Sequence, residues 1–518
     1  MTNEAVKADI AEKPARSNIV FAFICLFLGY FFIRCAVFTA LGAGMTAFVP
    51  LFIAVSAVFM KKRGMKLSPA ALVYPVIMLA LSPVFIISGR GFIRVLTLLF
   101  EIFIAIYWYF SASGCREEGK IGDMLPFDAV KSVFVMPFTS FTALPRAITA
   151  TAKRSRAGRG ALYILLGIAC AIIPAAVIIT LLASSDDAFA NLLGIISDSF
   201  LTGFVKNLLY IAWGLPVAMY IFGLTHSCSS GKNRDIMTRG QCERFSGELG
   251  VLPPLAVYTA FTLILAIYAL FFAAQSSYFL SAFASLKPEG FTYADYARKG
   301  FFELCGVSAI NAGIICVSSL LVKRDKTDGA KPLTGLRVCS LIMCVFTLVL
   351  IATAMAKLYM YIGCYGLTLR RVNAAWFMLL LTAVFIFIAV RQFTPRFNFW
   401  RASAVVFTAL FALLAFVNVD VYIARYNIAR FCDGTLDSLD VAMFYTLSDE
   451  VLPEVDALLD SDRLDADTRE EAEQYVESIS QSIKLRSDKP HSFDDYINAA
   501  LSYNLPRAGL ERFAEKYR

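Results

Sequence analysis

The stretch Tyr293-Ala-Asp-Tyr-Ala-Arg-Lys-Gly-Phe-Phe-Glu-Leu304 leads from charged and aromatic residues directly into an apolar run. Glu303 stands at the start of that run, which is long enough to cross a bilayer because a crossing takes about 20 apolar residues. Aromatic and charged residues before such a run are typical of a helix that begins at a membrane surface. The stretch therefore predicts a transmembrane helix over residues 301–322, with an acidic group near one membrane face.

The whole chain is more apolar than a soluble protein. Of its 518 residues, 58% are hydrophobic and 17% are charged, whereas soluble domains average about 45–50% and about 25%. We therefore predict an all-α, polytopic transmembrane helical bundle of about eleven spans. The predicted spans cover residues 19–38, 43–60, 70–88, 91–110, 160–183, 204–224, 252–274, 301–322, 337–360, 373–391 and 401–421.

Charge divides the chain into parts of different character. Residues 432–518 hold 9 Lys and Arg against 20 Asp and Glu, whereas the preceding residues hold 39 against 20. We expect a polar N-terminus over residues 1–18, a transmembrane domain over residues 19–431 and an acidic, helical tail over residues 432–518. One tail helix should present a single apolar face because its apolar residues recur at helical spacing. That face consists of Ala472, Tyr475, Val476, Ile479 and Ile483.

The basic residues between the spans set the expected orientation. With eleven spans, their clusters fall on the same side of the membrane as the N-terminus, and basic connections face the cytoplasm. We therefore expect a multi-pass protein of the cell membrane with a cytoplasmic N-terminus and an extracytoplasmic tail; an even number of spans would place the tail inside. The clusters lie at Lys61–Arg63, Lys153–Arg159, Lys232–Arg239, Lys323–Lys326 and Arg391–Arg401.

Two connections are longer than simple linkers. Residues 127–151 mix apolar and polar side chains around Pro137 and Pro145, and end in a basic cluster. We expect them to lie in the cytoplasmic membrane interface. Residues 275–299 are rich in aromatic side chains, which gather at the headgroup level of membranes. They are expected on the outer side.

The residue counts exclude several kinds of site and partner. Only His226 and His491 are present, which excludes a metal centre of three or four histidines. The 12 cysteines show no Cys-x-x-Cys spacing, so we expect no cofactor. No basic stripe with interleaved aromatics stands out, which argues against nucleic acid. The lipid bilayer is the expected partner, an envelope protein could bind the tail, and the small-molecule substrate is unknown.

Charged residues inside the spans are the candidate site residues, because a charge at bilayer depth costs at least about 2.5–3.5 kcal/mol. Glu101 lies in the middle of the span over residues 91–110. Arg94 lies two helical turns away, about 10.5 Å, and cannot pair with it. Glu101 therefore needs a partner from another helix, a water-filled cavity or a bound proton. It is the best candidate for a proton or cation step, although a neutral Glu hydrogen-bonded between helices fits equally well.

Glu303 begins a second candidate group. A stripe of residues follows it on one helical face, and glycines in that stripe let another helix approach closely, so Glu303 should face protein. Lys357 and Arg425 fall near the same outer interface, where either could pair with Glu303. Such a pair could also serve only to fasten helices together. The stripe consists of Gly306, Ile310, Gly313 and Val317.

Several stretches resemble a known family. They read Tyr296-Ala-Arg-Lys-Gly-Phe-Phe-Glu-Leu304, Lys357-Leu-Tyr-Met-Tyr-Ile-Gly-Cys-Tyr-Gly-Leu-Thr-Leu-Arg-Arg371, Ile423-Ala-Arg-Tyr-Asn-Ile-Ala-Arg430 and Ser502-Tyr-Asn-Leu-Pro-Arg507. From about residue 70 onward the chain resembles the bacterial membrane family called domain of unknown function 4173, within the broader 4153 group. This resemblance implies the membrane architecture and no established activity.

Three functions remain open at this point. Transport or ion/proton coupling is favoured by the number of spans and by Glu101. The alternative is a non-enzymatic role in the envelope, sensing or scaffolding through the tail. An enzyme acting on a lipid-linked substrate comes last, since only Glu303, Asp295 and Arg298 could supply acid–base and phosphate-binding groups, and no nucleophile or metal-ligand spacing accompanies them.

Overall fold

The computed structural model is built from helices in the part of the chain that it describes. That part comprises residues 16–65, 69–116, 121–152, 202–231, 235–283, 301–323, 334–486 and 493–517, with a few isolated positions between 153 and 201. Outside the helices, one isolated bridge pairs Leu252 with Val322. The predicted all-α helical bundle is confirmed.

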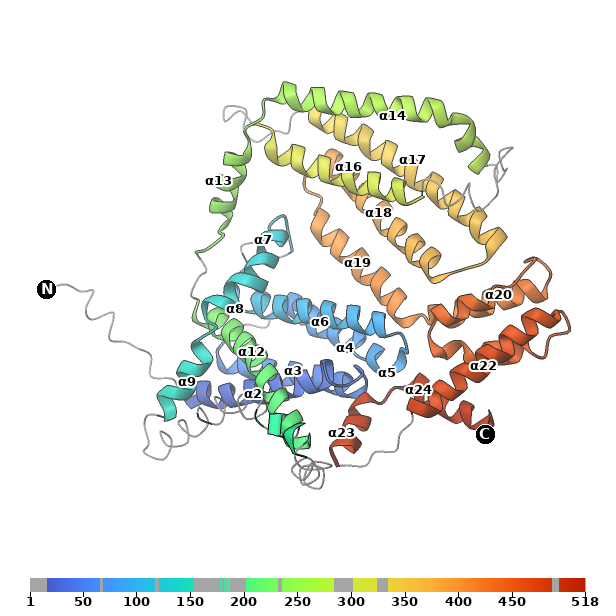
Figure 1. Ribbon diagram of the computed structural model, residues 1–518. Helices are drawn as coiled ribbons and strands as arrows, with labels where there is room; N and C mark the ends of the chain where they lie inside the picture. The colour runs from blue at the N-terminus through green and yellow to red at the C-terminus, as the bar shows by residue number, and fades with distance from the viewer. Residues whose placement is uncertain are drawn as a thin grey trace.

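The first helices form one bundle, drawn in blue and green in Figure 1. They pack through apolar side chains such as Phe48, Phe52 and Trp108, while large apolar side chains such as Phe23 and Phe92 stay exposed, as lipid-facing residues do. The helices are α2 (Arg16–Ala36), α3 (Ala43–Lys62), α4 (Pro69–Leu81), α5 (Val84–Ile87), α6 (Gly91–Ala112) and α12 (Thr202–Ser230).

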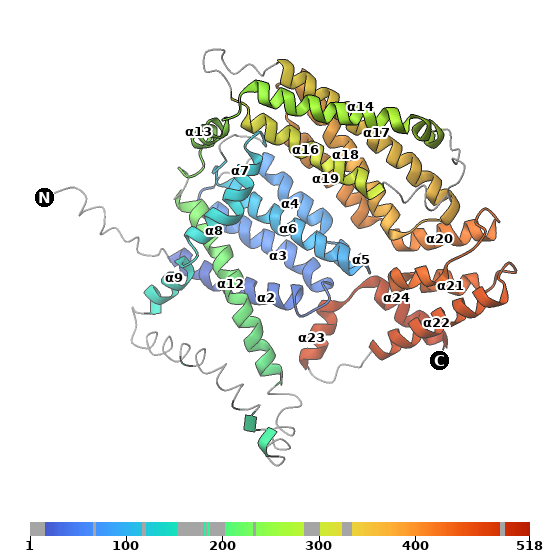
Figure 2. The same cartoon turned by 45° about the horizontal axis from the view of Figure 1, so that its top comes forward.

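A second bundle follows the helix α13 (Arg239–Leu249) and lies beside the first, as Figure 2 shows. Rings at the junction join the two bundles, because Phe100 of α6 meets Phe407 and Phe411 edge to face. At another point, Arg391 makes a double hydrogen bond to Asp123, with both N–O distances 2.7 Å. The helices are α14 (Pro254–Phe283), α16 (Phe301–Leu321), α17 (Thr334–Tyr365), α18 (Leu369–Phe393) and α19 (Phe399–Phe416).

Ten helices in the described residues are long and apolar enough to cross a membrane. Nine of them coincide with predicted spans, and the predicted span 301–322 is α16, with Gly306–Leu321 as its apolar part. The predicted span 160–183 falls almost entirely outside the described residues. The last predicted span is shorter than expected because the chain becomes extended at Val417 and Asn418 caps a new helix.

The tenth apolar segment, residues 125–150, coincides with the segment predicted to lie in the interface. It is not one straight helix. The structure divides it into α7 (Leu125–Val130), a π-helix η1 (Lys131–Val135), α8 (Met136–Thr139) and α9 (Ala143–Ala152). The chain turns at residues 140–142, where Ser140 closes α8.

The acidic tail is helical, as predicted, and has its own apolar core. The expected face of α22 (Ala466–Arg486) is confirmed, since Ala472, Tyr475, Val476 and Ile483 are buried and Ile479 is partly buried. Helix α20 (Val419–Cys432) shares this core. The other elements are η3 (Val441–Thr446), η4 (Asp449–Val451), α21 (Leu452–Leu458), α23 (Phe493–Ser502), α24 (Leu505–Ala514) and η5 (Glu515–Tyr517).

The tail lies at the opposite end of the bundles from α9 and α13. Figures 1 and 2 show α20 to α24 gathered at one end, whereas α9 and α13 lie at the other. The first residue of α3, Ala43, hydrogen-bonds Tyr503 of the acidic tail, whereas Lys61 and Lys62 lie in the last turn of that helix.

The contact between α2 and α12 depends on two glycines. A Cβ atom placed on Gly29 would collide with the carbonyl oxygen of Gly214 and lie 3.0 Å from the backbone nitrogen of Ala218. These neighbours are backbone atoms of another helix, so they cannot move aside without separating the helices. The first bundle therefore requires glycine at this crossing.

Gly29→Ala is expected to lower the thermal unfolding temperature of the purified protein, because overpacking a tight contact costs roughly 1–3 kcal/mol. Gly313→Ala is the matched control. Gly313 also lies inside a long helix, but a Cβ there would meet nothing within 4 Å, so its unfolding temperature should be unchanged or slightly higher. Equal loss of stability in both variants would refute the account of the α2–α12 contact.

Candidate functional site

Glu101 lies on the inner face of α6. Only 3% of its surface is exposed, and neither carboxylate oxygen has a hydrogen-bond partner in the described part of the chain. Its inward direction follows from the pattern of the helix. Ile93, Thr97 and Ile104 share the buried face, whereas Leu99 is exposed on the opposite side. Both the buried face and the exposed side of α6 are therefore largely apolar, and the carboxyl group of Glu101 lies on the buried face.

Glu101 is one of the residues that line a cavity of about 410 Å³ in the first bundle. Apart from Glu101, this cavity is bounded by apolar and aromatic side chains, and no Lys, Arg or His is among them. We call it the Glu101 cavity. Its lining comes from α2 (Phe32), α3 (Met45, Phe48, Val49, Phe52), α4 (Met78), α6 (Leu98, Ile102, Ala105, Ile106, Tyr109), the α8 region (Phe138, Phe141) and α12 (Pro216, Val217, Tyr220, Ile221, Leu224).

Irregular helices border the cavity. The π-helix η1 precedes Phe138, and π-helical turns occur frequently at functional sites. Tyr220 of α12 donates a hydrogen bond of 2.9 Å to the carbonyl oxygen of Val133 in that π-helix. Pro216 interrupts the hydrogen-bonding pattern of α12 where it lines the cavity. Backbone departures of this kind are tolerated in membranes where the backbone is buried in protein or lines a cavity.

The chemistry available to Glu101 follows from these surroundings. An ionised carboxyl group inside an apolar membrane domain is costly unless a cation compensates it. The lining supplies no cationic side chain. The carboxyl group can therefore be held as the neutral acid, or as a carboxylate beside a cation that enters the cavity. A residue that takes up and releases a proton alternates between these two states, the neutral acid and the carboxylate.

Arg94 lies in the first turn of α6, at the end of the helix that is nearer the tail and away from Glu101. Its guanidinium group donates hydrogen bonds to the carbonyl oxygens of Ala40 and, at 3.3 Å, Gly89. Both oxygens lie in connections between helices of the first bundle. A smaller polar pocket of about 190 Å³ contains Arg94 together with Glu450 and Arg507 of the tail. Arg94 is thus part of the contact between bundle and tail.

Two ion pairs with little exposure hold the tail on the first bundle. Nε of Arg90 lies 3.3 Å from Oδ1 of Asp420, and the two side chains are 6% and 3% exposed. The other oxygen of Asp420 accepts a 2.9 Å hydrogen bond from the backbone of Ser448. On α2, Arg34 pairs with Asp494. These pairs could not be predicted from the sequence, because the partners are distant along the chain.

Backbone contacts complete this junction. The amide of Ala43 donates a 2.9 Å hydrogen bond to the carbonyl oxygen of Tyr503. The side chain of Asn504 donates to the carbonyl oxygens of Ser88 (2.9 Å) and Phe85 (3.2 Å). Asn504 lies in the stretch Ser502–Arg507 that resembles the known family. This stretch therefore joins the tail to the first bundle.

Glu450 of the tail lies against the loop before α6, where burial raises the pKa of its carboxyl group above the ordinary value of 4.5. Hydrogen bonds from Asn418 and from the backbone of Gly89, and the charge of Arg94, oppose this effect without cancelling it. The folded protein therefore binds this proton more tightly than the unfolded chain does.

The free energy of unfolding should consequently contain a contribution from Glu450 that is largest at acid pH. This contribution is lost as the pH rises from the ordinary value of 4.5 through the raised pKa of Glu450, because ionisation is then easier in the unfolded chain. Thermal unfolding of Glu450→Gln should lack this component, since a glutamine oxygen still accepts from Asn418 and carries no charge. Identical pH profiles for the two proteins would contradict the assignment.

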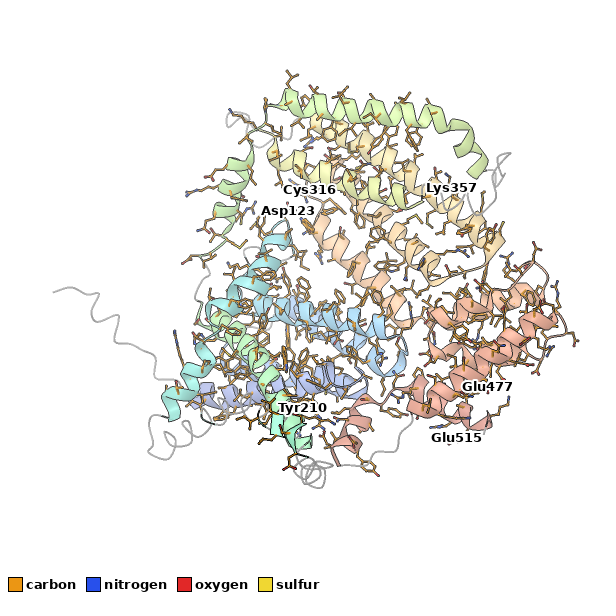
Figure 3. All side chains as sticks on the ribbon, viewed as in Figure 1. Asp123, Tyr210, Cys316, Lys357, Glu477 and Glu515 are labelled. Carbon is orange, nitrogen blue, oxygen red and sulfur yellow. The ribbon has the colours of Figure 1, made fainter. Side chains whose placement is uncertain are left out.

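The predicted group of Glu303, Lys357 and Arg425 is only partly described. The guanidinium group of Arg425 hydrogen-bonds Glu454 of α21 at 2.7 and 2.9 Å. Lys357 is partly buried near the end of α17, and Figure 3 shows it on the side of the tail. Glu303 lies in the first turn of α16, but its side chain and the whole of Arg298 fall outside the described residues.

The prediction that the stripe after Glu303 faces another helix of this chain is wrong. Gly306, Ile310, Gly313 and Val317 are exposed, and a Cβ on either glycine would meet nothing within 4 Å. Polarity explains the outcome, because the other face of α16 carries Asn311. Asn311 is fully buried and hydrogen-bonds Thr347 of α17 at 2.8 Å, as well as Tyr268 of α14. Polar groups in a membrane bundle turn toward partners.

Two of the family-like stretches meet in the structure. The side chain of Asn427 on α20 accepts a 2.7 Å hydrogen bond from the amide of Leu367 and donates a 2.8 Å bond to its carbonyl oxygen. Gly366, at φ +71, lies against Asn427 and leaves no room for a side chain. Arg430 donates to the carbonyl oxygen of Ile362 at 3.2 Å. These stretches thus fix α20 to the loop between α17 and α18.

A family model described as "Domain of unknown function (DUF4153)" matches residues 73–458. The match includes Glu101, most of the second bundle and the first part of the tail. No curated protein and no solved structure matches the chain.

Proposed function

The chain belongs to the family described as "Domain of unknown function (DUF4153)", and we propose that it is a transport protein in which Glu101 takes up and releases a proton or another cation. The observation that supports this function is the unpartnered, buried carboxyl group of a residue that lines an otherwise apolar cavity. An intramembrane ionisable residue is costly and is therefore a functional candidate by default.

The proposal also covers the setting of the protein. We place it in the narrower 4173 family and in the bacterial cell membrane, with the N-terminus in the cytoplasm and the tail outside. The support is the charge difference between the ends of α3, since Ala43 at its start hydrogen-bonds Tyr503 of the acidic tail, whereas Lys61 and Lys62 lie in its last turn. Basic connections face the cytoplasm. In this setting the Glu101 cavity lies between two aqueous compartments.

A test of this function uses the purified chain reconstituted in vesicles that enclose a pH-sensitive dye. A potassium gradient with valinomycin sets the membrane potential, and the dye then reports proton flux. Flux that requires Glu101 supports transport. Flux at the rate of protein-free vesicles in the unaltered protein would refute it.

The second candidate, a role in the envelope through the tail, has one observation in its favour. The tail has its own apolar core and is held on the first bundle by ion pairs of low exposure. An envelope protein that binds this tail could act on the bundle through those contacts. Removing residues 433–518 separates the two functions, because transport through the first bundle alone should persist if the bundle stays folded.

A further inference from the structure

We propose that the Glu101 cavity binds a lipophilic organic cation, a ligand with one positive charge and a largely aromatic or aliphatic body. This inference rests on the proposed function and names the class of substrate that the cavity would accept. It follows from three properties of the cavity, namely its single acidic group, its aromatic lining and its volume.

The ligand must carry a positive charge for Glu101 to remain ionised. Both carboxylate oxygens lack a hydrogen-bond partner in the described residues, and the lining contains no basic side chain. A cation placed beside the carboxylate would supply the compensation that the protein does not. An anionic ligand would instead add a second charge of the same sign in a medium that screens charges poorly.

An inorganic cation fits the cavity poorly. Ions such as Ca²⁺ take six to eight oxygen ligands, and Mg²⁺ takes six. Besides Glu101, the lining has only the hydroxyl groups of Tyr109 and Tyr220 as side-chain oxygens, and the Tyr220 hydroxyl donates to Val133. A search of the described residues finds no group of three or more His, Cys, Asp or Glu side chains that could hold a metal ion.

An organic cation is complementary to the rest of the lining. Phe48, Phe52, Phe138 and Phe141 offer aromatic faces, which attract cations through their π electrons. A volume of about 410 Å³ lies within the range of about 300–1,000 Å³ that is usual for sites of drug-sized molecules. Apolar side chains of the lining would bury the body of such a ligand.

Binding is coupled to a proton in this scheme. The empty cavity holds Glu101 as the neutral acid. When the cation enters, the carboxyl O–H bond breaks, the proton leaves to solvent, and the carboxylate forms an ion pair with the ligand. One proton is therefore released for each singly charged ligand bound. The reverse steps return the proton to Glu101 as the ligand leaves.

The probe for this site is tetraphenylphosphonium, a permanent cation with an aromatic body. Equilibrium dialysis of the purified full-length protein in detergent measures binding, and a pH electrode in weakly buffered solution measures proton release. The neutral analogue triphenylphosphine oxide reports the apolar contribution to binding in the cavity, without the charge. We expect saturable binding of the cation with one proton released per cation, and weaker binding of the neutral analogue.

Variants assign the binding to the cavity. Glu101→Gln should weaken tetraphenylphosphonium binding at least about tenfold, because it removes one partner of a buried charge pair, and should abolish proton release. Its affinity for triphenylphosphine oxide should be unchanged, which shows that the cavity remains folded. Glu101→Asp should keep the proton release. Glu243→Gln is the control, because Glu243 is exposed on α13 and far from the cavity.

Each result either supports or overturns the inference. Equal cation binding by the unaltered protein and Glu101→Gln would show partition into detergent or protein and would overturn it. Absence of cation binding, together with proton flux that depends on Glu101 in vesicles, would overturn the ligand class and leave the proposed function intact. Absence of both cation binding and proton flux would remove the inference and the proposed function together.

Discussion

Replacing Glu101 by Gln is expected to reduce proton flux through the reconstituted protein to the rate of protein-free vesicles. The reason is that Glu101 is the acidic residue of the cavity lining, and the remaining side chains of the lining are apolar or phenolic. Glutamine has nearly the same shape and cannot release a proton. The pH-sensitive dye assay measures this loss directly.

Two further variants test whether that loss comes from a change in shape or stability and not from the missing acid. Glu101→Asp retains an acid one methylene shorter and should restore part of the flux, whereas a purely steric role would make it at least as harmful as the glutamine. Glu243→Gln, a change at the surface of α13, should leave the flux unchanged. The thermal unfolding temperature of Glu101→Gln at neutral pH should be equal to or higher than that of the unaltered protein, since glutamine avoids the cost of protonating a carboxylate on folding. Flux that persists in a folded Glu101→Gln protein would exclude Glu101 from transport.

Breaking the ion pair between Arg90 and Asp420 is expected to have the largest effect on stability. Both side chains are almost fully buried, and removing one partner leaves the other as an uncompensated buried charge. Such changes cost about 3–5 kcal/mol. Arg90→Met and Asp420→Asn should each loosen the tail, which limited proteolysis detects as earlier cleavage within residues 433–517.

The double variant tests whether the pair is the cause. Because neither charge remains in Arg90→Met/Asp420→Asn, its stability should be higher than the sum of the single losses implies, and asparagine can still accept from the backbone of Ser448. The exposed pair of Arg239 and Glu243 on α13 is the control. Glu243→Gln should cost less than about 1 kcal/mol. Additive losses at Arg90 and Asp420 would show that the two residues act separately.

The helices could be predicted because membrane spans are encoded locally. A run of apolar residues predicts α6 or α17 without knowledge of its neighbours, and the charges at depth single out Glu101 in the same way. The end of α19 was harder to place. The apolar pattern continues past Phe416, and only the local backbone at Val417, with the capping side chain of Asn418, shows that one helix ends and another begins.

The partners of the charged residues could not be predicted, because they depend on tertiary structure. Arg34 and Asp494 are 460 positions apart in the sequence, and no periodicity links them. The orientation of α16 was predicted incorrectly for a related reason. The glycine pattern suggested a close helix contact, but the buried hydrogen bonds of Asn311 determined which face turned inward.

The segment around the π-helix was only partly understood from sequence. Asp128 and Lys131 are both buried there, although their segment was expected to lie in the interface. They lie three positions apart in a stretch with few other charges, and this spacing was the available signal. The segment also supplies Phe138 and Phe141 to the Glu101 cavity, a contribution that depends on the bend of the chain and not on its composition.

The central claim is that Glu101 exchanges a proton inside the cavity, and infrared difference spectroscopy of the carboxyl C=O stretch tests it most directly. Spectra of the purified protein at a series of pH values are compared with those of Glu101→Gln. We predict a carboxyl band that gains and loses intensity with pH, disappears on addition of tetraphenylphosphonium and is absent in Glu101→Gln. Identical difference spectra for the two proteins would show that Glu101 does not change its protonation, and would contradict the account.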